Sequence, residues 1–442
     1  MRILKISTNS GGGATTAANR QAIALRKAGH EVKHLYVRQD WQSKNVDIIS
    51  EGDDIYITSP MPEFLKTDLI FQNYLENNRT DISNTYMSLW RTETTFDARL
   101  LEFIQQMRFD IVHCHWTSNL VSSRLLKKLK DFNVRVVVTG HDMNHFTGAC
   151  HYDAGCNGFT TGCEACSHLK SDKFNLIGAS MAEKFDSYTY VKPHYIFPSD
   201  WLNGAYRTSI IGKALGSESS TVIRNCIDTD FFSPAENAQK IVIRDAFGFD
   251  GEEILIVSGA ENNHEIRKGF NYFENAFKAL NRSLYGSALN KRVTFVAFGG
   301  GSHQLQPTHP NVSYRHLGTL KEEQVRDLFR VADLLAFTSI EENFANVILE
   351  SLMCACPVLG FRVGGVPDIV IPNENGVLVD SIDENDFSTQ LINIVLGGKL
   401  SRLHESMHEW RNKSFHRYSL ENIAHELVEL YTKTLEGEPT NA

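Results

Sequence analysis

The stretch that decides the fold is DLLAFTSIEENFANVILESLMCACPVLGF, residues 333–361. It begins with an apolar run that predicts a buried strand ending at Ser339, and a polar loop then leads to a helix that begins near Asn346. The apolar residues PVLGF, 357–361, predict the next strand. Strand, helix and strand in this order form a parallel pair joined by a right-handed crossover. We therefore expect an α/β fold with a parallel sheet.

The start of this helix is also a candidate binding site. A helix that begins at a strand end places unpaired backbone N–H groups and a positive dipole at the mouth of the sheet, where a diphosphate binds without a metal ion. Glu342 in the loop and Glu350 in the helix can both approach a ligand laid across the helix start. Carboxylates accept hydrogen bonds from the hydroxyls of sugars and riboses.

The same alternation of strands and helices extends along the chain on both sides of this stretch. Further apolar runs, separated by helix-length segments, predict the other strands. In the second half they are EEILIVSGA (252–260), RVTFVAFGG (292–300) and VSYRHLG (312–318); in the first half they are RILKIS (2–7), EVKHLYV (31–37), DIVHCH (110–115), VRVVVTG (134–140) and HYIFPS (194–199). This pattern predicts two doubly wound α/β domains in tandem.

A change of composition separates the two halves. Residues 214–240 are rich in Gly, Ser, Asn, Asp and Pro, which is typical of an interdomain linker. We therefore expect an N-terminal Rossmann-like domain over residues 1–220 and a C-terminal one over 221–418. Ser419 and the apolar spacing after it predict a last helix over 419–436 that packs back on the first domain. Because ligands bind at the carboxyl ends of parallel strands, the expected site is a cleft between the domains.

The glutamate pair and its surroundings resemble a known family signature. Glu342 and Glu350 have seven residues between them, and NFANVILESLMCACPVLGFRVGGVPDIV (343–370) surrounds the second. This segment resembles the retaining glycosyltransferase family 4, whose GT-B fold has two Rossmann-like domains facing across a cleft. Members often have Gly-Phe-Gly where this chain has Asn343-Phe344-Ala345, and Gly at the position of Ala355. The Asn-Phe-Ala-Asn version is similar to a subgroup common in bacterial surface-polysaccharide gene clusters.

The resemblance implies roles for residues of the second domain. Glu342 would lie near the donor sugar, and Glu350 would bind the ribose of the nucleotide. Lys268 matches the family's conserved lysine, which would neutralise the leaving diphosphate; the partner arginine falls on Asn263, for which Arg267 is the expected substitute. The implied donor-binding residues are Gly12, Gly13, Arg267, Lys268, Gly299, Glu342, Asn343, Phe344, Ala345, Asn346, Val347 and Glu350.

Two features of the first domain complete the predicted site. The glycine loop 11–13 follows the first strand, and in the family this loop approaches the donor or the acceptor; a simple tight turn is the alternative. His141 ends a predicted strand and matches the family's histidine beside the donor sugar, with a buried core histidine as the alternative. The predicted catalytic set is His141, Glu342 and Lys268. Candidates for the acceptor pocket are His113, His115 and Trp116.

Four cysteines form a separate cluster in the sequence. Their spacing is C-x5-C-x6-C-x2-C, and they are Cys150, Cys156, Cys163 and Cys166. Thiolates so close together indicate a tetrahedral structural zinc, while disulfides and free thiols are the alternatives. Any zinc here would be structural, because four cysteines would fill its coordination sphere.

Composition narrows the class of partner. A hydrophobic content of 42% and a charged content of 22% are those of a globular protein. The net charge is +1 over residues 1–220 (24 Lys+Arg, 23 Asp+Glu) and −10 over the rest (20 and 30), which argues against nucleic acid as the main partner. Neither a signal peptide nor an apolar run long enough to span a membrane is present, so a cytoplasmic location is expected. A basic stretch, Arg124 to Lys130, predicts a solvated helix face, with peripheral contact to the inner membrane surface as the alternative.

Together these features predict a retaining, metal-independent glycosyltransferase. It would move a hexosyl-type sugar from a nucleoside-diphosphate sugar to a hydroxyl of a glycan, lipid-linked or other acceptor, in cell-surface polysaccharide biosynthesis. No catalytic cofactor is expected. The alternatives are a GT-B epimerase or phosphorylase and a non-catalytic nucleotide-sugar-binding module.

Overall fold

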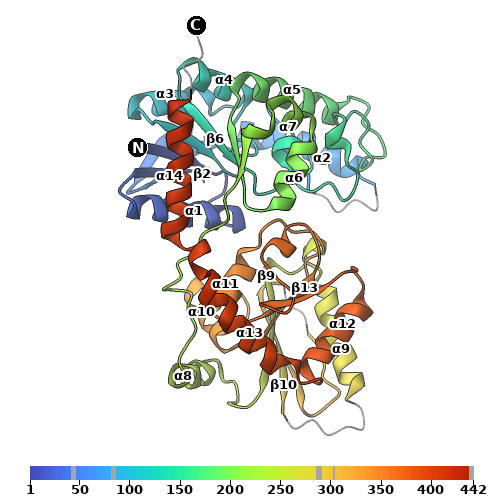
Figure 1. Cartoon of the computed structure of the whole chain (residues 1–442). Helices are drawn as coiled ribbons and strands as arrows, with labels where there is room; N and C mark the ends of the chain where they lie inside the picture. The colour runs from blue at the N-terminus through green and yellow to red at the C-terminus, as the bar shows by residue number, and fades with distance from the viewer. Residues whose placement is uncertain (41–45, 81–85, 285–290, 302–303, 438–442) are drawn as a thin grey trace. The chain divides into compact units, whose positions relative to one another are not determined.

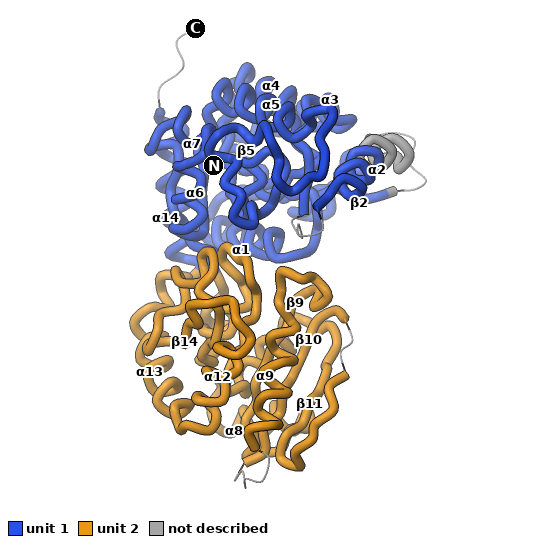
Figure 2. The backbone as a smooth tube through the Cα atoms, turned by 90° about the vertical axis from the view of Figure 1, so that its right-hand side faces the viewer, with its two compact units in different colours: residues 1–226, 420–442 blue, residues 227–419 orange. Residues whose placement is uncertain are grey.

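The chain consists of two compact units. The computed structural model describes residues 1–40, 46–80, 86–284, 291–301 and 304–437. Unit 1 comprises Met1–Cys226 together with Leu420–Ala442, and unit 2 comprises Ile227–Ser419 (Figure 2). Each is a largely parallel sheet covered by helices, which confirms the predicted fold class of two doubly wound α/β domains.

Unit 1 is built on an eight-stranded sheet within the described residues, in the order β3-β4-β2-β1-β5-β6-β7-β8. Only β3 and β4 pair in antiparallel fashion. The strands are β1 (Arg2–Ile6), β2 (Glu31–Asp40), β3 (Ile48–Glu51), β4 (Asp54–Pro60), β5 (Ile111–Cys114), β6 (Arg135–Thr139), β7 (His194–Phe197) and β8 (Ser220–Val222). The helices are α1 (Gly13–Lys27), α2 (Met61–Asn78), α3 (Asp97–Met107), α4 (Ser123–Asp131), α5 (Leu176–Val191), α6 (Asp200–Thr208), α7 (Ile210–Leu215) and α14 (Leu420–Glu436) (Figure 1).

Alternation along the strands of unit 1 sorts side chains between two cores. Ile3 and Ile111 pack in one core with α1 and α14, and Leu4 and Val112 pack in the other with α3, α4 and α5. Because side chains two residues apart share a face, Lys5 follows Ile3 to the α1–α14 side. A polar residue is therefore placed under two helices, and it requires polar partners there.

Among its described residues, unit 2 is built on a six-stranded parallel sheet in the order β11-β10-β9-β12-β13-β14. Helices α9 and α12 bury one face with Ile256 and Phe295, and α10, α11 and α13 bury the other with Val257 and Val296. The strands are β9 (Ile254–Asn262), β10 (Val293–Gly300), β11 (Val312–His316), β12 (Leu334–Phe337), β13 (Val358–Phe361) and β14 (Gly376–Val379). The helices are α8 (Asn237–Phe247), α9 (Phe270–Ser283), α10 (Glu322–Val331), α11 (Asn346–Met353), α12 (Glu384–Val395) and α13 (Lys399–Ser414).

Each sheet has one point at which the order of its strands reverses. In unit 1 the chain moves from β1 to β2 on one side and later to β5 on the other; in unit 2 it moves from β9 to β10 and later to β12. The loops after two such neighbouring strands diverge, one to each side, and leave a crevice at their carboxyl ends. The predicted site residues follow β1, β6, β9 and β12.

Helix α14 returns the end of the chain to unit 1. It lies alongside α1 (Figure 1), and its side chains Ile423, Leu427 and Tyr431 are fully buried in the core that also contains Leu25 of α1. The chain therefore leaves unit 1 after residue 226 and re-enters it at residue 420.

Two observations bear on membrane contact. No helix in the described ranges is both long and apolar enough to cross a bilayer. In the basic stretch, Arg124 pairs with Glu93 at 2.9 Å, Lys127 with Asp186 at 2.5 Å and Lys128 with Asp131 at 3.2 Å. Three basic side chains of this stretch are thus paired with carboxylates of unit 1.

Replacing Leu427 with alanine should destabilise the protein by about 2 to 5 kcal/mol, because it removes a fully buried side chain between α14 and the sheet. The measurement is the free energy of unfolding in urea. Leu435→Ala on the same helix, where the side chain is 36% exposed, is the matched control and should have a much smaller effect. Equal losses in the two variants would contradict this role of α14.

Candidate functional site

In unit 2, two cations and one carboxylate meet at the point where the strand order reverses. The Nζ atom of Lys268 lies 2.7 Å from Oε2 of Glu342, and Nη1 of Arg267 lies 3.3 Å from the same oxygen. Arg267 also donates to the backbone carbonyl of Glu341 at 2.9 Å. The structure thus brings Arg267 and Lys268 to the same oxygen of Glu342, and the replacement of the family's arginine by Arg267 stays a prediction.

Glu342 remains ionised although it is buried. Its side chain is 11% exposed. Burial raises the pKa of Glu342, but the charges of Lys268 and Arg267, the hydrogen bond from Lys268 and that from the backbone N–H of Asn343 together lower it to about 2. The carboxylate of Glu265 also pairs with Arg267, with Oε1 2.9 Å from Nε, so two carboxylates in all face the two cations of this cluster.

Two glycines hold the loops of this cluster together. Gly269 has φ of 61°, and a Cβ atom there would lie 2.1 Å from the carbonyl oxygen of Thr338. Gly364 has φ of 50°, and a Cβ atom there would lie 1.9 Å from the carbonyl oxygen of Glu342. Only glycine fits either position. The sequence contains both glycines, but their role depends on close backbone approaches that spacing does not reveal.

The predicted diphosphate loop leads into α11. Asn343, Phe344 and Ala345 are buried, and α11 begins at Asn346 without a side-chain cap and without an acidic residue in its first turn. Such a helix start carries N–H donors and a positive dipole with no carboxylate of its own to neutralise it. Val347 lies in the first turn and Glu350 in the second, both partly exposed.

Gly299 and Ala355 occupy special backbone positions in the same unit. Gly299 has φ of 100°, and a Cβ atom there would lie 1.7 Å from the carbonyl oxygen of Ala260, so the ends of β10 and β9 approach each other closely. Ala355, where relatives often have glycine, has φ of 63°. Ala355 therefore adopts, at this turn, the left-handed backbone conformation that favours glycine.

In unit 1, the glycine loop and the first helix form a second helix start that has no side-chain cap. Gly12 has φ of 90° and caps α1, which begins at Gly13 with no acidic residue in its first turn. Gly11 and Gly13 are exposed and Gly12 is partly exposed. This loop follows β1 at the carboxyl end of the sheet.

His141 follows β6 and belongs to a chain of buried polar groups. Its Nε2 atom lies 2.9 Å from Nδ1 of His115, and Nε2 of His115 lies 2.9 Å from Nζ of Lys5. Lys5 also reaches Oε1 of Gln21 at 2.8 Å and Nδ1 of His113 at 3.4 Å. Lys5 lies in β1, His115 directly follows β5 and His141 follows β6, and these three strands are neighbours in the sheet.

These hydrogen bonds determine which ring nitrogens of His115 and His141 carry protons when Lys5 is an ammonium. An ammonium only donates, so Nε2 of His115 accepts and its proton is on Nδ1. That proton is donated to Nε2 of His141, whose own proton is then on Nδ1. Burial lowers the pKa of His141 to about 4, so this imidazole is neutral at pH 7. Burial lowers the pKa of Lys5 to about 7, so this assignment holds below that pH, where Lys5 is an ammonium and His141 carries its proton on Nδ1.

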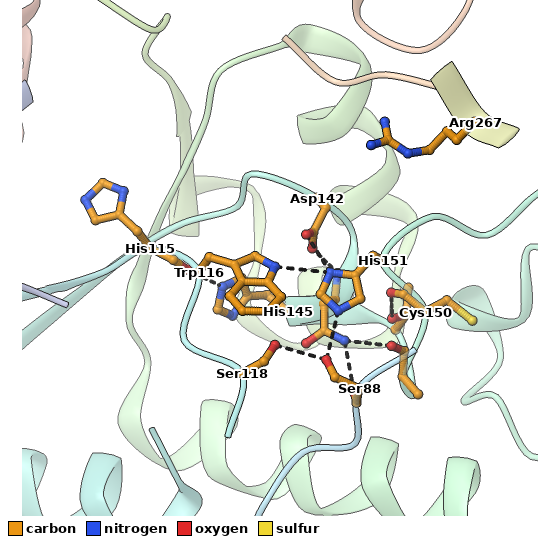
Figure 3. A network of polar contacts seen from close by, with 12 residues as sticks. Ser88, His115, Trp116, Ser118, Asp142, His145, Cys150, His151 and Arg267 are labelled. Carbon is orange, nitrogen blue, oxygen red and sulfur yellow. Dashed lines mark hydrogen bonds and ion pairs between the residues drawn. The ribbon is translucent and has the colours of Figure 1, made fainter. Parts of the chain in front are cut away.

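The residue after His141 anchors a second network that the sequence did not reveal. Oδ2 of Asp142 lies 2.6 Å from Nδ1 of His151, and Nε2 of His151 lies 2.8 Å from Oγ of Ser88 (Figure 3). Trp116, one of the candidates for an acceptor pocket, lies against the same imidazole with ring centroids 5.5 Å apart.

His113, another candidate for the acceptor pocket, is buried and hydrogen-bonded to Thr139 and to Tyr431 of α14. His113 therefore has a structural role under α14.

The four clustered cysteines are free thiols in the structure. Cys150 is buried and Cys156 is exposed, with the hydrogen bond from His168 lowering the pKa of Cys156. Among the described residues, which include all four cysteines, no group of three or more His, Cys, Asp or Glu side chains is arranged to hold a metal ion. The geometry therefore gives the zinc alternative no support.

Comparison with known proteins identifies the family. Residues 11–231, half of the chain, match the family model described as Glycosyltransferase Family 4, and residues 252–396 match Glycosyl transferases group 1. The chain belongs to glycosyltransferase family 4. The group 1 match includes β9, β10 and β12 of unit 2, and the family 4 match begins after β1 and includes β2 and β5 of unit 1.

Individual relatives of this family 4 member are distant. N-acetyl-alpha-D-glucosaminyl L-malate synthase of Bacillus anthracis is 29% identical over 26% of this chain and 30% of its own length. WcaC of Escherichia coli, named for glycosyl transfer in colanic acid biosynthesis, is 25% identical over 63% of this chain and 64% of its own length. The chain therefore spans less than two thirds of either relative.

Solved structures match over nearly the whole chain. Sucrose-phosphate synthase of Thermosynechococcus elongatus has a TM-score of 0.67 and 17% identity, over 99% of this chain and 100% of that one. HepE of Anabaena in complex with UDP-glucose has a TM-score of 0.60 and 14% identity, over 98% and 100%. At these identities the likeness establishes the GT-B fold alone.

The buried histidines make unit 1 sensitive to acid. Burial lowers the pKa of His141 and of His145 to about 4, whereas an unfolded histidine titrates near its ordinary 6.5. The unfolded state therefore binds more protons below pH 6.5, and the free energy of unfolding should be highest above pH 6.5 and fall as the pH drops towards 4. Urea titrations at several pH values measure this slope.

His145→Gln should make the slope shallower, because one buried imidazole is lost. His425→Gln, at an exposed position on α14, is the control and should keep the wild-type slope. A free energy of unfolding that does not change between pH 6.5 and 4 would contradict the buried neutral state of these imidazoles.

Proposed function

We propose that this chain is a glycosyltransferase that takes its sugar from a nucleoside-diphosphate sugar bound to unit 2. The observation that carries the proposal is the convergence of Lys268 and Arg267 on Glu342 at the carboxyl ends of β9 and β12, followed in sequence by the uncapped start of α11. A diphosphate is a dianion or more, and this place supplies two side-chain cations and a helix dipole.

Lys268 and Arg267 would act on the leaving group. When the bond from the sugar to the diphosphate breaks, negative charge develops on the phosphate oxygen. Cations held before the reaction stabilise that charge without reorganisation, and the carboxylate of Glu342 fixes their positions. Glu342 would also accept a hydrogen bond from a donor-sugar hydroxyl, and Glu350 one from the ribose. Leaving-group stabilisation of this kind needs no metal ion.

His141 would act from unit 1, together with the glycine loop. Its defined tautomer makes its Nδ1–H a donor for a sugar oxygen, since Nε2 already accepts from His115. We propose that unit 1 supplies the acceptor side and unit 2 the donor side. Retention of anomeric configuration, with the acceptor attacking from the leaving-group side, is proposed from family membership.

The acceptor is proposed to be a hydroxyl of a glycan or lipid-linked glycan in surface-polysaccharide synthesis. Support comes from WcaC, whose name assigns it to colanic acid biosynthesis, and from the Asn343–Asn346 sequence variant. Action at the inner face of the membrane would suit such an acceptor. UDP is proposed as the nucleotide to test first, because HepE is titled as a UDP-glucose complex.

Binding of UDP, GDP or ADP should raise the melting temperature of the full chain. A ligand at a hundred times its Kd adds about 2.7 kcal/mol to the free energy of unfolding. Lys268→Met should abolish most of the shift, and Lys278→Met, an exposed lysine on α9, should preserve it. If no nucleotide or nucleotide sugar raises the melting temperature of the wild type, the proposed donor class is wrong.

Glu342→Gln should reduce sugar transfer by about a hundredfold or more, because it removes the anion that orients both cations and the donor sugar. Initial rates with the donor found by thermal shift measure the loss. UDP binding should survive in this variant, since Lys268 and Arg267 remain. Unchanged transfer by Glu342→Gln would remove the main support for this mechanism.

A further inference from the structure

We infer that unit 1 carries a binding site for a neutral sugar of the acceptor, formed by the carboxylate of Asp142 and the rings of Trp116 and Tyr86. The inference rests on the proposed function, because it names a subsite for the acceptor of that reaction. Its residues lie on the loops that follow β5 and β6 and on the segment that leads to Trp90, all within unit 1. Figure 3 shows Asp142 and Trp116 on either side of His151.

Asp142 is a fixed anion with a small exposed surface. Its Oδ2 atom accepts from Nδ1 of His151 at 2.6 Å and its Oδ1 atom accepts from the backbone N–H of Asn144 at 2.9 Å. The side chain remains 13% exposed. Burial raises the pKa of Asp142, but His151 and the N–H of Asn144 lower it to about 2. An oriented carboxylate of this kind is a ready acceptor for a hydroxyl group.

His151 is held rigidly behind this carboxylate. It is 5% exposed, and its Nε2 atom lies 2.8 Å from Oγ of Ser88, which in turn lies 3.0 Å from Oγ of Ser118. Its backbone N–H donates to the carbonyl of Tyr86 at 3.0 Å. The imidazole is therefore fixed from both ends, and it orients Asp142 as a supporting residue.

The indole N–H of Trp116 is poorly matched in this arrangement. Its Nε1 atom lies 3.3 Å from Nδ1 of His151, the nitrogen that donates its proton to Asp142 at 2.6 Å. One nitrogen cannot both donate that proton and accept from the indole, and the shorter contact to a carboxylate prevails. The indole N–H thus faces another donor, and a ligand oxygen beside Asp142 would give it an acceptor.

Two aromatic rings border the same imidazole. The ring of Trp116 lies 5.5 Å from it at 33°, and the ring of Tyr86 lies 4.8 Å from it at 45°. Trp116 is partly exposed, and Tyr86 is 51% exposed. Exposed aromatic faces next to a carboxylate and an N–H donor provide what a pyranose requires: apolar surface for its C–H face, an acceptor for one hydroxyl and a donor for a neighbouring oxygen.

The charge of the site selects the class of sugar. Asp142 is a permanent anion, so a phosphorylated or carboxylated sugar would bring like charges together, which disfavours binding. A neutral sugar would bind without that penalty. Asp142 directly follows His141, and consecutive Cα atoms are about 3.8 Å apart. A sugar bound at Asp142 therefore lies next to the histidine proposed to act in the transfer.

The test is a titration of the full-length protein with methyl glycosides of glucose, galactose and mannose, followed by protein NMR. We expect saturable binding of at least one of them. Asp142→Asn and Tyr86→Ala should each raise its Kd about tenfold or more, because a charged hydrogen bond or an aromatic contact is lost. Trp116→Phe, which keeps a ring but removes the N–H, should also weaken binding.

Controls separate binding from folding and from charge. Phe132→Ala, at another position in unit 1 with 51% exposure, should leave the Kd unchanged. Tyr86 is exposed enough that its replacement should not alter the melting temperature. Glucose 6-phosphate should bind more weakly than methyl glucoside in the wild type, and the difference should shrink in Asp142→Asn.

Three outcomes would overturn the subsite: no saturable binding of any glycoside at its highest soluble concentration, equal Kd values in wild type, Asp142→Asn and Tyr86→Ala, or tighter binding of the phosphorylated sugar. The thermal shift by nucleotides is measured on the same samples. If that shift persists while the glycosides fail, the donor site stands and only this subsite is wrong. If both fail, the proposed function fails as well.

Discussion

Reversal of strand order in a parallel sheet is the constraint on which the other features of both units depend. A right-handed crossover can return to either side of the first strand, and where two crossovers diverge, the loops above the sheet separate. In unit 2 this brings the turn after β9 against the loop after β12, although Lys268 and Glu342 are 74 positions apart in the sequence. In unit 1 it sets the strand ends of β1, β5 and β6 side by side. The polar residues described for each unit lie at these points because the separated loops leave space for side chains there.

The two units differ in the partners of their buried charged and polar side chains. At Glu342 a buried carboxylate is compensated by Lys268 and Arg267, and Arg267 is paired with Glu265 as well. In unit 1 three imidazoles are joined to Lys5 by hydrogen bonds, and burial lowers the pKa of His113, His115 and His141. Neutral, directional groups discriminate geometry better than charge. Such a division suits a reaction in which a diphosphate leaves on one side and an uncharged hydroxyl arrives from the other.

The sequence predicted the fold and most members of the unit 2 cluster, because both follow from strand ends. The apolar runs marked β1, β2, β5, β6, β7 and the central strands of unit 2, and residues next to strand ends could be assigned to one edge of a sheet. Arg267 was harder to assign, since its approach to Glu342 depends on the left-handed turn at Gly269.

The polar networks of unit 1 could not be predicted from the sequence. Lys5 resembles any other strand residue in the sequence, because its partners lie up to 110 residues away. The network of Asp142 and His151 joins two points of one irregular loop to Ser88, and no periodicity describes such a loop. Cysteine spacing likewise left the cluster undecided, since a ligand set requires converging side chains as well as proximity in sequence.

The return of α14 to unit 1 has a consequence for the order in which the molecule is made. Unit 2 is one continuous segment whose two ends are paired, with the backbone N–H of Ile227 donating to the carbonyl of Tyr418 at 2.8 Å. It has all of its residues as soon as residue 419 has left the ribosome. Unit 1 is made first but cannot close its α1 face until residues 420–436 arrive, because Leu427 and Tyr431 fill that core. The N-terminal sheet must therefore wait through the synthesis of a whole second unit with an apolar surface exposed, a state in which chaperones act on nascent chains.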